Sequence, residues 1–251
     1  MKKNILQNVL FCMAALAFLL IFWQIACVTT KNEYLIPSVW NCIQTAFSLL
    51  GEGVFWTAFF ATLLRCFLAF VISFVLAVIF ALAAYLLPWF SKFFAPIVAS
   101  IRSLPAMAVI LILLVMAGGG NTPVIVAYLT LFPMLYTCVY SALCDTDESL
   151  IQMSKIYCVP LKKQIAALYI PSALPNVTLG ASAALSHSLK VVVSAEILSH
   201  TYQSLGRWME ESSLYDGRPE LFALVLMICL TGLVIETAGN IVATALQGRV
   251  R

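Results

Sequence analysis

Residues 148–196 read ESLIQMSKIYCVPLKKQIAALYIPSALPNVTLGASAALSHSLKVVVSAE, and this stretch decides the fold of the chain. It opens with a polar interruption between two long apolar segments. A Pro-x-x-x-Pro step, Pro171 to Pro175, follows the interruption. Next comes an apolar segment long enough to cross a bilayer, which takes about 20 residues, and this segment contains a lysine. A simple connector between two helices would not need this much internal order.

The composition is typical of a membrane protein. Of the 251 residues, 63% are hydrophobic and 10% are charged, whereas soluble domains carry about 25% charged residues. We therefore expect an all-α fold, a polytopic membrane helical bundle. We attribute the net charge of +3 to an unequal distribution of lysine and arginine between the loops on the two sides of the membrane. We do not take it as a sign of nucleic-acid binding. The eight cysteines lack CxxC or Cys/His spacing, so no metal or redox site is predicted.

About six transmembrane helices, each near the ~20 apolar residues that a bilayer requires, are the simplest interpretation. They lie at roughly 8–28, 57–87, 93–117, 122–143, 176–198 and 221–246. The first is too long for a signal-peptide core and has no A-x-A site, so we expect it to remain as a helix. A short amphipathic helix at 38–50, with Trp40 and Phe47 on its apolar side, is too short to span and is predicted to be extracytoplasmic.

Lysine and arginine in short loops predict the orientation. With the N-terminus inside, the cytoplasmic side collects Lys2, Lys3, Lys92, Lys155, Lys162, Lys163, Arg249 and Arg251, and the other side keeps Lys31, Arg207 and Arg218. Both termini and the 148–175 loop are therefore predicted to be cytoplasmic. We divide the chain into 1–55, which holds the first helix and the amphipathic helix, and 56–251, a five-helix core.

The third span is interrupted by Ser100-Ile101-Arg102-Ser103-Leu104-Pro105. A proline inside a membrane helix frees a carbonyl that neighbours or water must satisfy. Arg102 and Pro105 are therefore candidates to line a wet cavity. The alternative is that Arg102 lies in an early turn and snorkels to the cytoplasmic headgroups. The triple glycine at 118–120 is not followed by Gly-Lys-Ser/Thr, so energy must come from a partner or an ion gradient.

The 149–170 region predicts two short amphipathic helices joined at Val159-Pro160. Their apolar positions are Leu150, Met153, Ile156 and Tyr157 in the first and Leu161, Ile165, Leu168 and Tyr169 in the second. Such a pair either lies on the lipid headgroups or offers its apolar ridge to another surface.

This loop resembles the EAA loop of the membrane-spanning permease subunits of ABC importers. The resemblance is to the nitrate/taurine/alkanesulfonate group of the binding-protein-dependent transport family, where Glu-Ala-Ala, three residues and Gly precede Ile-x-x-Pro. The spacing up to Pro171 and Pro175 matches, but Gln152, Ser154 and Cys158 replace the residues of the first half. Cysteine adopts left-handed backbone angles less cheaply than glycine. Similar family segments occur in the same order at 56–70, 96–105, 195–196 and 219–223.

The resemblance implies a type I ABC importer permease-like fold and a loop that docks into a cytoplasmic ATPase subunit. The coupling residues that it indicates are Gln152, Ser154, Ile156, Cys158, Leu161, Ile165, Leu168, Pro171 and Pro175. It also implies two permease copies as a homodimer, two ATPase subunits, an extracytoplasmic solute-binding protein and a bacterial plasma (inner) membrane. ATP and Mg would be bound by the partner subunits, so the chain itself is predicted to be no enzyme and to need no cofactor.

The fifth span carries a polar stripe with a four-residue spacing. Its members are Ser182, Ser186, Lys190 and Ser194, with His187 on the same side. Together with Arg102, Pro105 and Glu196 they are the candidate translocation-path residues. A lysine at mid-span costs about 2.5–3.5 kcal/mol, so it should face the bundle interior or water.

The role of the lysine has two explanations. Lys190 either meets an anionic substrate or forms a structural ion pair with Glu236 or another subunit, and His187 on its own is typical of an interhelical hydrogen bond. Arg65 and Glu196 have opposite charges at similar inferred depth, so a pair between them is a further hypothesis.

The sequence thus predicts the permease subunit of an ATP-driven ABC importer for a small solute, with Lys190 favouring negative charge on that solute. The alternative is an ion-coupled secondary transporter or channel that uses Lys190, Glu196 and Glu236 as its own relay. Inverted internal repeats would support that alternative, and the sequence shows none that we detect.

Overall fold

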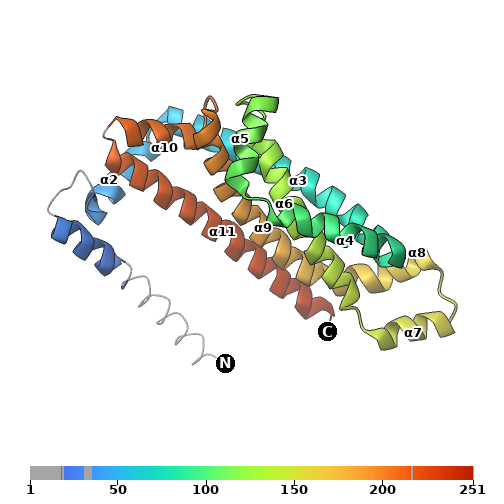
Figure 1. Ribbon diagram of the computed structural model, residues 1–251. Helices are drawn as coiled ribbons and strands as arrows, with labels where there is room; N and C mark the ends of the chain where they lie inside the picture. The colour runs from blue at the N-terminus through green and yellow to red at the C-terminus, as the bar shows by residue number, and fades with distance from the viewer. Residues whose placement is uncertain (1–17, 19, 31–35, 216, 251) are drawn as a thin grey trace. The chain divides into compact units, whose positions relative to one another are not determined.

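The computed structural model describes residues 18, 20–30, 36–215 and 217–250, and within these ranges the regular structure is entirely helical (Figure 1). The all-α prediction is therefore confirmed for the described chain. Of the predicted first span, the described part contains the short apolar helix Leu20–Thr30. The rest of that span, up to residue 17, lies outside the described residues.

Four described helices are long and apolar enough to cross a membrane, or five spans if a bent pair counts as one. The helices of the described chain are α2 (Val39–Leu50), α3 (Gly53–Leu86), α4 (Pro88–Ser103), α5 (Ala106–Ala117), α6 (Thr122–Cys144), α7 (Glu148–Ile156), α8 (Leu161–Gln164), the π-helix η1 (Ile165–Tyr169), α9 (Ile170–Ser199), α10 (Leu205–Leu214) and α11 (Arg218–Val250). The bent pair is α4 and α5, which meet at 90°. The predicted interruption of the third span is therefore present.

The chain forms two compact units. Unit 1 combines Met1–Trp56 with Trp208–Met227, and unit 2 combines Thr57–Arg207 with Ile228–Arg251. The sequence-based division at residue 55 stays a prediction.

In unit 1, Trp23 of the first described helix contacts the segment before α2 and a residue of α11. Its Nε1 donates to the carbonyl of Pro37 at 3.2 Å, and its ring lies 5.6 Å from that of Phe222. The α2 helix begins after Ser38, whose Oγ accepts from the Asn41 amide at 3.2 Å, a standard N-cap. Trp40 and Phe47 are exposed on α2. This outward apolar face is what an interfacial helix requires.

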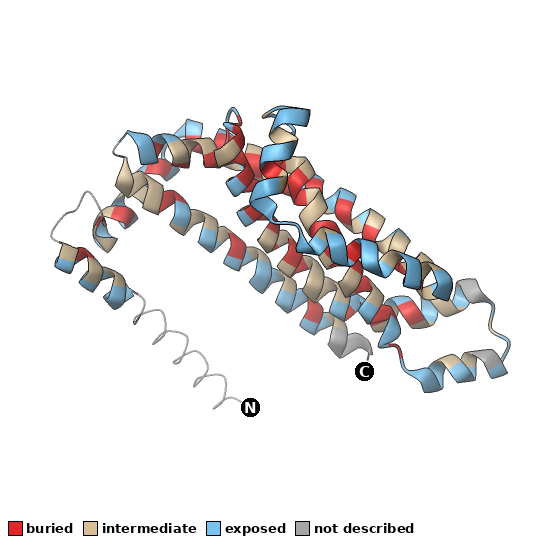
Figure 2. Ribbon diagram, viewed as in Figure 1, coloured by how far each residue is buried: buried red, intermediate tan, exposed pale blue. Residues whose placement is uncertain are grey.

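In unit 2, α6 and α9 run side by side and form the centre of the core (Figure 1). Buried positions gather on α3, α6 and α9, while α4, α5 and α7 are mostly exposed (Figure 2). The buried positions of α3 are small residues at three- and four-residue spacing: Cys66, Ala69, Ser73, Ala77, Ala81 and Ala84. Small side chains let membrane helices approach closely, which favours association where lipid offers no hydrophobic driving force.

Glycines lie where α9 and its neighbours approach each other closely. A Cβ added at Gly180 would overlap Sγ of Cys138 on α6, and one added at Gly239 of α11 would overlap Ser182. A Cβ at Gly232 would lie 3.1 Å from Oγ of Ser186. Helix α9 therefore packs directly between α6 and the second half of α11.

The predicted start of the fifth span at 176 was too late. The helix that carries it runs without a break from Ile165 to Ser199, through both prolines. The π-helical turn explains this, because the amide of Ile170 donates to the carbonyl of Ile165, five residues back. The wider turn lets Pro171 follow without the usual clash of its ring against the preceding turn.

Candidate functional site

The first part of the predicted coupling loop, helix α7 and the residue after it, presents four apolar side chains that are exposed in the described chain. The exposed fractions are 39% for Leu150, 52% for Met153, 78% for Ile156 and 75% for Tyr157. The helix begins after Asp147, whose carboxylate accepts the Ser149 amide at 2.9 Å, and hydrogen bonds from Ser149 lower the pKa of Asp147. The predicted ridge is thus present and available to a partner surface.

The polar coupling residues of α7 have local roles. The Gln152 side chain is exposed, and Ser154 Oγ donates to the Ile151 carbonyl at 2.7 Å. Ser154 also offers its carbonyl to the amide of Val159 at 3.0 Å, the six-to-one bond of a Schellman C-cap.

Cys158 occupies the left-handed position of that C-cap, with φ of 51°. This is the place where the family pattern has glycine. The chain therefore keeps the turn geometry that the family pattern implies, although a left-handed backbone conformation is less favourable for cysteine than for glycine.

The second part of the loop is packed into unit 2. Ile165 and Leu168 are half-buried and Pro175 is buried. Tyr169 is buried too, and its hydroxyl accepts from the hydroxyl of Tyr85 on α3 at 3.3 Å. Pro171 is half-buried, and the side chain of Leu161 lies outside the described part. The predicted coupling residues therefore divide into an outward surface on α7 and a packed base of α9.

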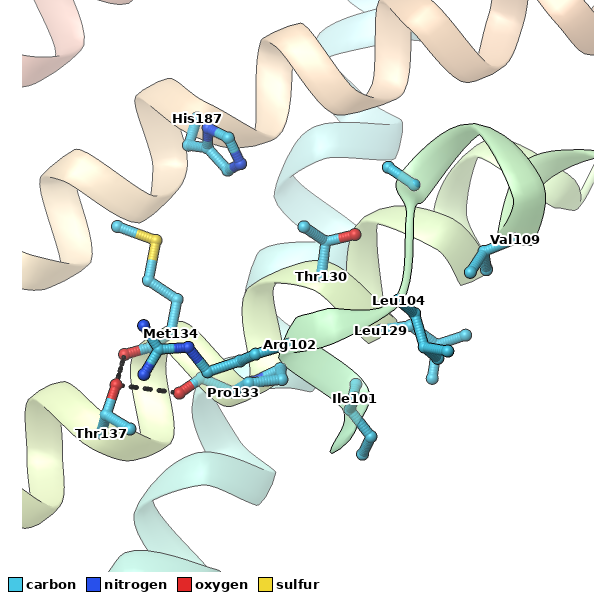
Figure 3. A pocket seen from close by; sticks show the side chains of 11 residues that line it. Ile101, Arg102, Leu104, Val109, Leu129, Thr130, Pro133, Met134, Thr137 and His187 are labelled. Carbon is cyan, nitrogen blue, oxygen red and sulfur yellow. Dashed lines mark hydrogen bonds between the residues drawn. The ribbon is translucent and has the colours of Figure 1, made fainter. Parts of the chain in front are cut away.

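The elbow between α4 and α5 borders an open cavity of about 280 Å³ in unit 2 (Figure 3). Leu104 and Pro105 form the elbow in extended conformation, with ψ of 128° and 121°, as expected for a proline and the residue before it. The cavity brings together two predicted path residues, Arg102 from α4 and His187 from α9. Pro105 itself is exposed and does not line it.

Arg102 lies in the last turn of α4, not in an early one. Helix α4 begins at Pro88, so Arg102 is roughly 21 Å along the helix axis from its start. Arg102 is therefore not in an early turn of α4, and the alternative that its side chain snorkels to the headgroups stays a prediction.

The polar stripe of α9 is split in the structure. Ser182 and Ser186 are buried and face the glycines of α11, whereas Lys190 and Ser194 are exposed. Within the described residues Lys190 forms no ion pair with Glu236, which is itself exposed, or with any other side chain. The described part of one chain therefore supplies no counter-charge for Lys190, and both a pair with another subunit and a path role for the exposed half stay predictions.

Glu196 is fully buried and joins α9 to α3. Its Oε1 lies 2.8 Å from Nη1 of Arg65, so the hypothesis of this ion pair is confirmed. Oγ1 of Thr62 donates to the same carboxylate at 3.0–3.1 Å, and the amide of Gly206 donates to Oε2 at 3.2 Å. Oγ1 of Thr62 also accepts the Leu205 amide at 3.1 Å.

Thr62 was missed by the sequence reasoning. Its signal was its position three residues before Arg65, on the same face of a helix. Thr130 and Thr137, which line the elbow cavity, were missed as well, and a threonine inside an apolar span gives no such signal.

The chain matches a known protein family and is similar to named members of it. The family model described as binding-protein-dependent transport system inner membrane component matches residues 73–251. A probable ABC transporter permease protein of Brucella melitensis is 24% identical over 213 residues, which are 83% of this chain and 85% of that protein. A probable ABC transporter permease protein of Brucella abortus is also 24% identical, over 83% of this chain and 84% of its own length.

Two solved structures share the fold. An inward-facing structure of the MetNI methionine ABC transporter matches with a TM-score of 0.67 and 17% identity, over 78% of this chain and 98% of the matched chain. The structure of an amino acid ABC transporter with histidines matches with a TM-score of 0.62 and 15% identity, over 78% and 94%.

Proposed function

This chain belongs to the family of binding-protein-dependent transport system inner membrane components and is a multi-pass permease subunit of an ABC transporter, and we propose that it forms the translocation path of an ATP-driven importer. Two copies would work with two cytoplasmic ATPase subunits and an extracytoplasmic solute-binding protein. Both termini would face the cytoplasm of a bacterial plasma membrane. The single observation that carries the proposal is the uncovered apolar ridge of α7 at the base of a continuous helix.

The ridge has the chemistry of a helix that docks into a groove. Ile156 and Tyr157 are each about three-quarters exposed, and Lys163 is exposed near them in the chain. Apolar anchors at three- and four-residue spacing provide contact in such docking, and flanking cations set register. An ATPase subunit is the occupant that the family suggests.

The first turns of α9 form a segment at which the helix can bend. Pro171 and Pro175 both lack an amide proton, so two backbone hydrogen bonds are missing within the first two turns after the π-helix. A displacement of α7 would therefore bend the chain at 165–175. Helix α9 would transmit it toward the Arg65–Glu196 pair at its other end and bias the path between inward- and outward-facing states.

The solute is proposed to be small and anionic. Supporting this, Arg102 and Lys190 are exposed cations on or near the helices predicted to line the path. The resemblance of the loop to the nitrate/taurine/alkanesulfonate group supports the same class.

The test is reconstitution of the chain with its ATPase and binding protein in lipid nanodiscs. Wild-type complex should hydrolyse ATP faster when the binding protein is added. Ile156→Asp should abolish co-purification of the ATPase, whereas Leu214→Asp, at a leucine of similar exposure on α10, should leave it intact. Uptake into liposomes that needs an ion gradient and no ATP would overturn the proposal.

A further inference from the structure

The elbow cavity contains one formally charged side chain and no carboxylate. Its eleven lining residues are Ile101, Arg102, Leu104, Ala106, Val109, Leu129, Thr130, Pro133, Met134, Thr137 and His187. Arg102 projects along the wall formed by α6, and His187 faces the cavity from α9 (Figure 3). An uncompensated cation at this position in a membrane protein is costly unless water or a ligand meets it.

The cavity has hydrogen-bond donors, chiefly the N–H groups of Arg102, that suit a ligand with acceptor oxygens. Neither the guanidinium of Arg102 nor the imidazole of His187 has a hydrogen-bond partner within the described part of the chain. A guanidinium carries five donors in a fork that matches two oxygens of one anionic group. Arg102 is therefore an unused bidentate donor.

The two threonines face the cavity as acceptors. Thr130 Oγ1 donates its proton to the carbonyl of Val126 at 2.9 Å, and Thr137 Oγ1 donates to the carbonyls of Pro133 and Met134 at 3.0 and 2.9 Å. Their free lone pairs accept from a ligand N–H or O–H, or from water. The lining thus offers donors on one side and acceptors beside them.

The elbow also places an uncapped helix start at the same cavity. No side chain caps the first turn of α5, and Ala106 at its start lines the cavity. The amide protons of that turn are further hydrogen-bond donors beside those of Arg102. Broken helices in transport proteins occur where their ends line a cavity.

We infer that this cavity binds one small oxyanion group, a carboxylate, sulfonate or phosphate, with Arg102 as the bidentate donor and His187 as the second contact. The inference rests on the proposed function, because it makes this group part of the transported solute. At about 280 Å³ the cavity is at the lower end of small-molecule sites, so the solute it holds is small.

The test measures charge-selective labelling and needs no knowledge of the natural solute. Met134, which lines the cavity, is changed to cysteine in the full-length protein with its co-purifying subunits in nanodiscs. The reagents are the anionic sulfonatoethyl and the cationic trimethylammonioethyl methanethiosulfonates, with site-specific mass spectrometry separating residue 134 from the native cysteines. Ser141→Cys, an exposed site on the same helix outside the cavity, provides the reference ratio.

We expect the anionic reagent to be favoured at residue 134 by about tenfold relative to the reference site. Arg102→Gln should remove this preference and Arg102→Lys should retain most of it. Millimolar methanesulfonate should slow labelling at residue 134, while the neutral dimethyl sulfone should not.

A preference that survives Arg102→Gln, or equal protection by both sulfur compounds, would overturn the inference. If a carboxylate from a second copy pairs with Arg102, residue 134 should show no preference for the anionic reagent even when Arg102 is unchanged. That result would also overturn the inference. Failure of the proposed function would instead appear as absence of a co-purifying ATPase. The labelling result is independent of that outcome.

Discussion

Nη1 of Arg65 lies 2.8 Å from Oε1 of Glu196, and this pair ties α3 to the last turn of α9 across 131 residues of sequence. Arg65 Nη2 also donates to the carbonyl of Tyr202 at 3.2 Å, so the pair fixes the turn that follows α9. Two residues of that turn, His200 and Gln203, have left-handed φ of 48°. The ion pair therefore holds together two helices and a strained turn.

Removing one partner of this pair should strongly destabilise the protein. Arg65→Met leaves the fully buried Glu196 carboxylate without its cation, for which about 3–5 kcal/mol is typical. Glu196→Gln should cost less, since the amide oxygen still accepts from Gly206 and the remaining cation, Arg65, is partly exposed and still donates to the Tyr202 carbonyl. Thermal unfolding of the purified variants measures both.

Lys190→Met is the matched control for the ion pair. It also removes a cation, one that α9 itself carries, but Lys190 is exposed and forms no ion pair in the described chain, so the change should stay within about 0.5 kcal/mol. If Arg65→Met and Lys190→Met had equal effects, the structural role of the pair would be refuted.

Replacing Cys158 should stabilise or destabilise the C-cap of α7, depending on how easily the new residue adopts the left-handed backbone conformation. A non-glycine residue in left-handed conformation costs about 1–2 kcal/mol, so Cys158→Gly should slow local opening of 148–160. Cys158→Val, with a β-branched side chain at φ of 51°, should speed it. Amide hydrogen exchange across α7 gives the measurement, and faster exchange in Cys158→Gly would contradict the C-cap assignment.

A methyl group at Gly180 should separate α6 from α9. The added Cβ overlaps Cys138 Sγ, so Gly180→Ala should destabilise by about 1–3 kcal/mol. Adding Cys138→Ala should recover part of the loss, which a double-mutant cycle in thermal unfolding resolves. Gly120→Ala, where nothing lies within 4 Å, is the control expected to be silent. Absence of coupling between positions 138 and 180 would show that the helices do not touch there.

Periodicity and composition were sufficient to predict the later spans that the structure describes, the break near Pro105 and the amphipathic helix, because each is a local consequence of side-chain patterning. The π-helix at 165–169 was not predictable in this way, since its apolar spacing is equally compatible with an α-helix that ends before the prolines. The prolines consequently suggested a boundary where the structure has a continuous helix.

The polar stripe of α9 shows the other limit of sequence reasoning. Equal spacing of Ser182, Ser186 and Lys190 indicates one face but not which neighbour covers it. The glycines of α11 lie 46 to 57 positions further along the chain and bury only the first half. The elbow cavity was unpredictable for the same reason, because it joins Arg102 to His187 through the fold and not through spacing.

The missing amides at Pro171 and Pro175 should be needed for coupling. Pro171→Ala with Pro175→Ala supplies two N–H groups to carbonyls of the preceding turn, which should stiffen the base of α9. Movement of α7 would then no longer bend this segment, so ATP hydrolysis should continue while its stimulation by the binding protein falls several-fold. Pro96→Ala, which restores one amide inside α4 away from the loop, is the control. Full stimulation in the Pro171/Pro175 variant, or an equal loss in Pro96→Ala, would mean that the proline pair is not the hinge that links α7 to α9.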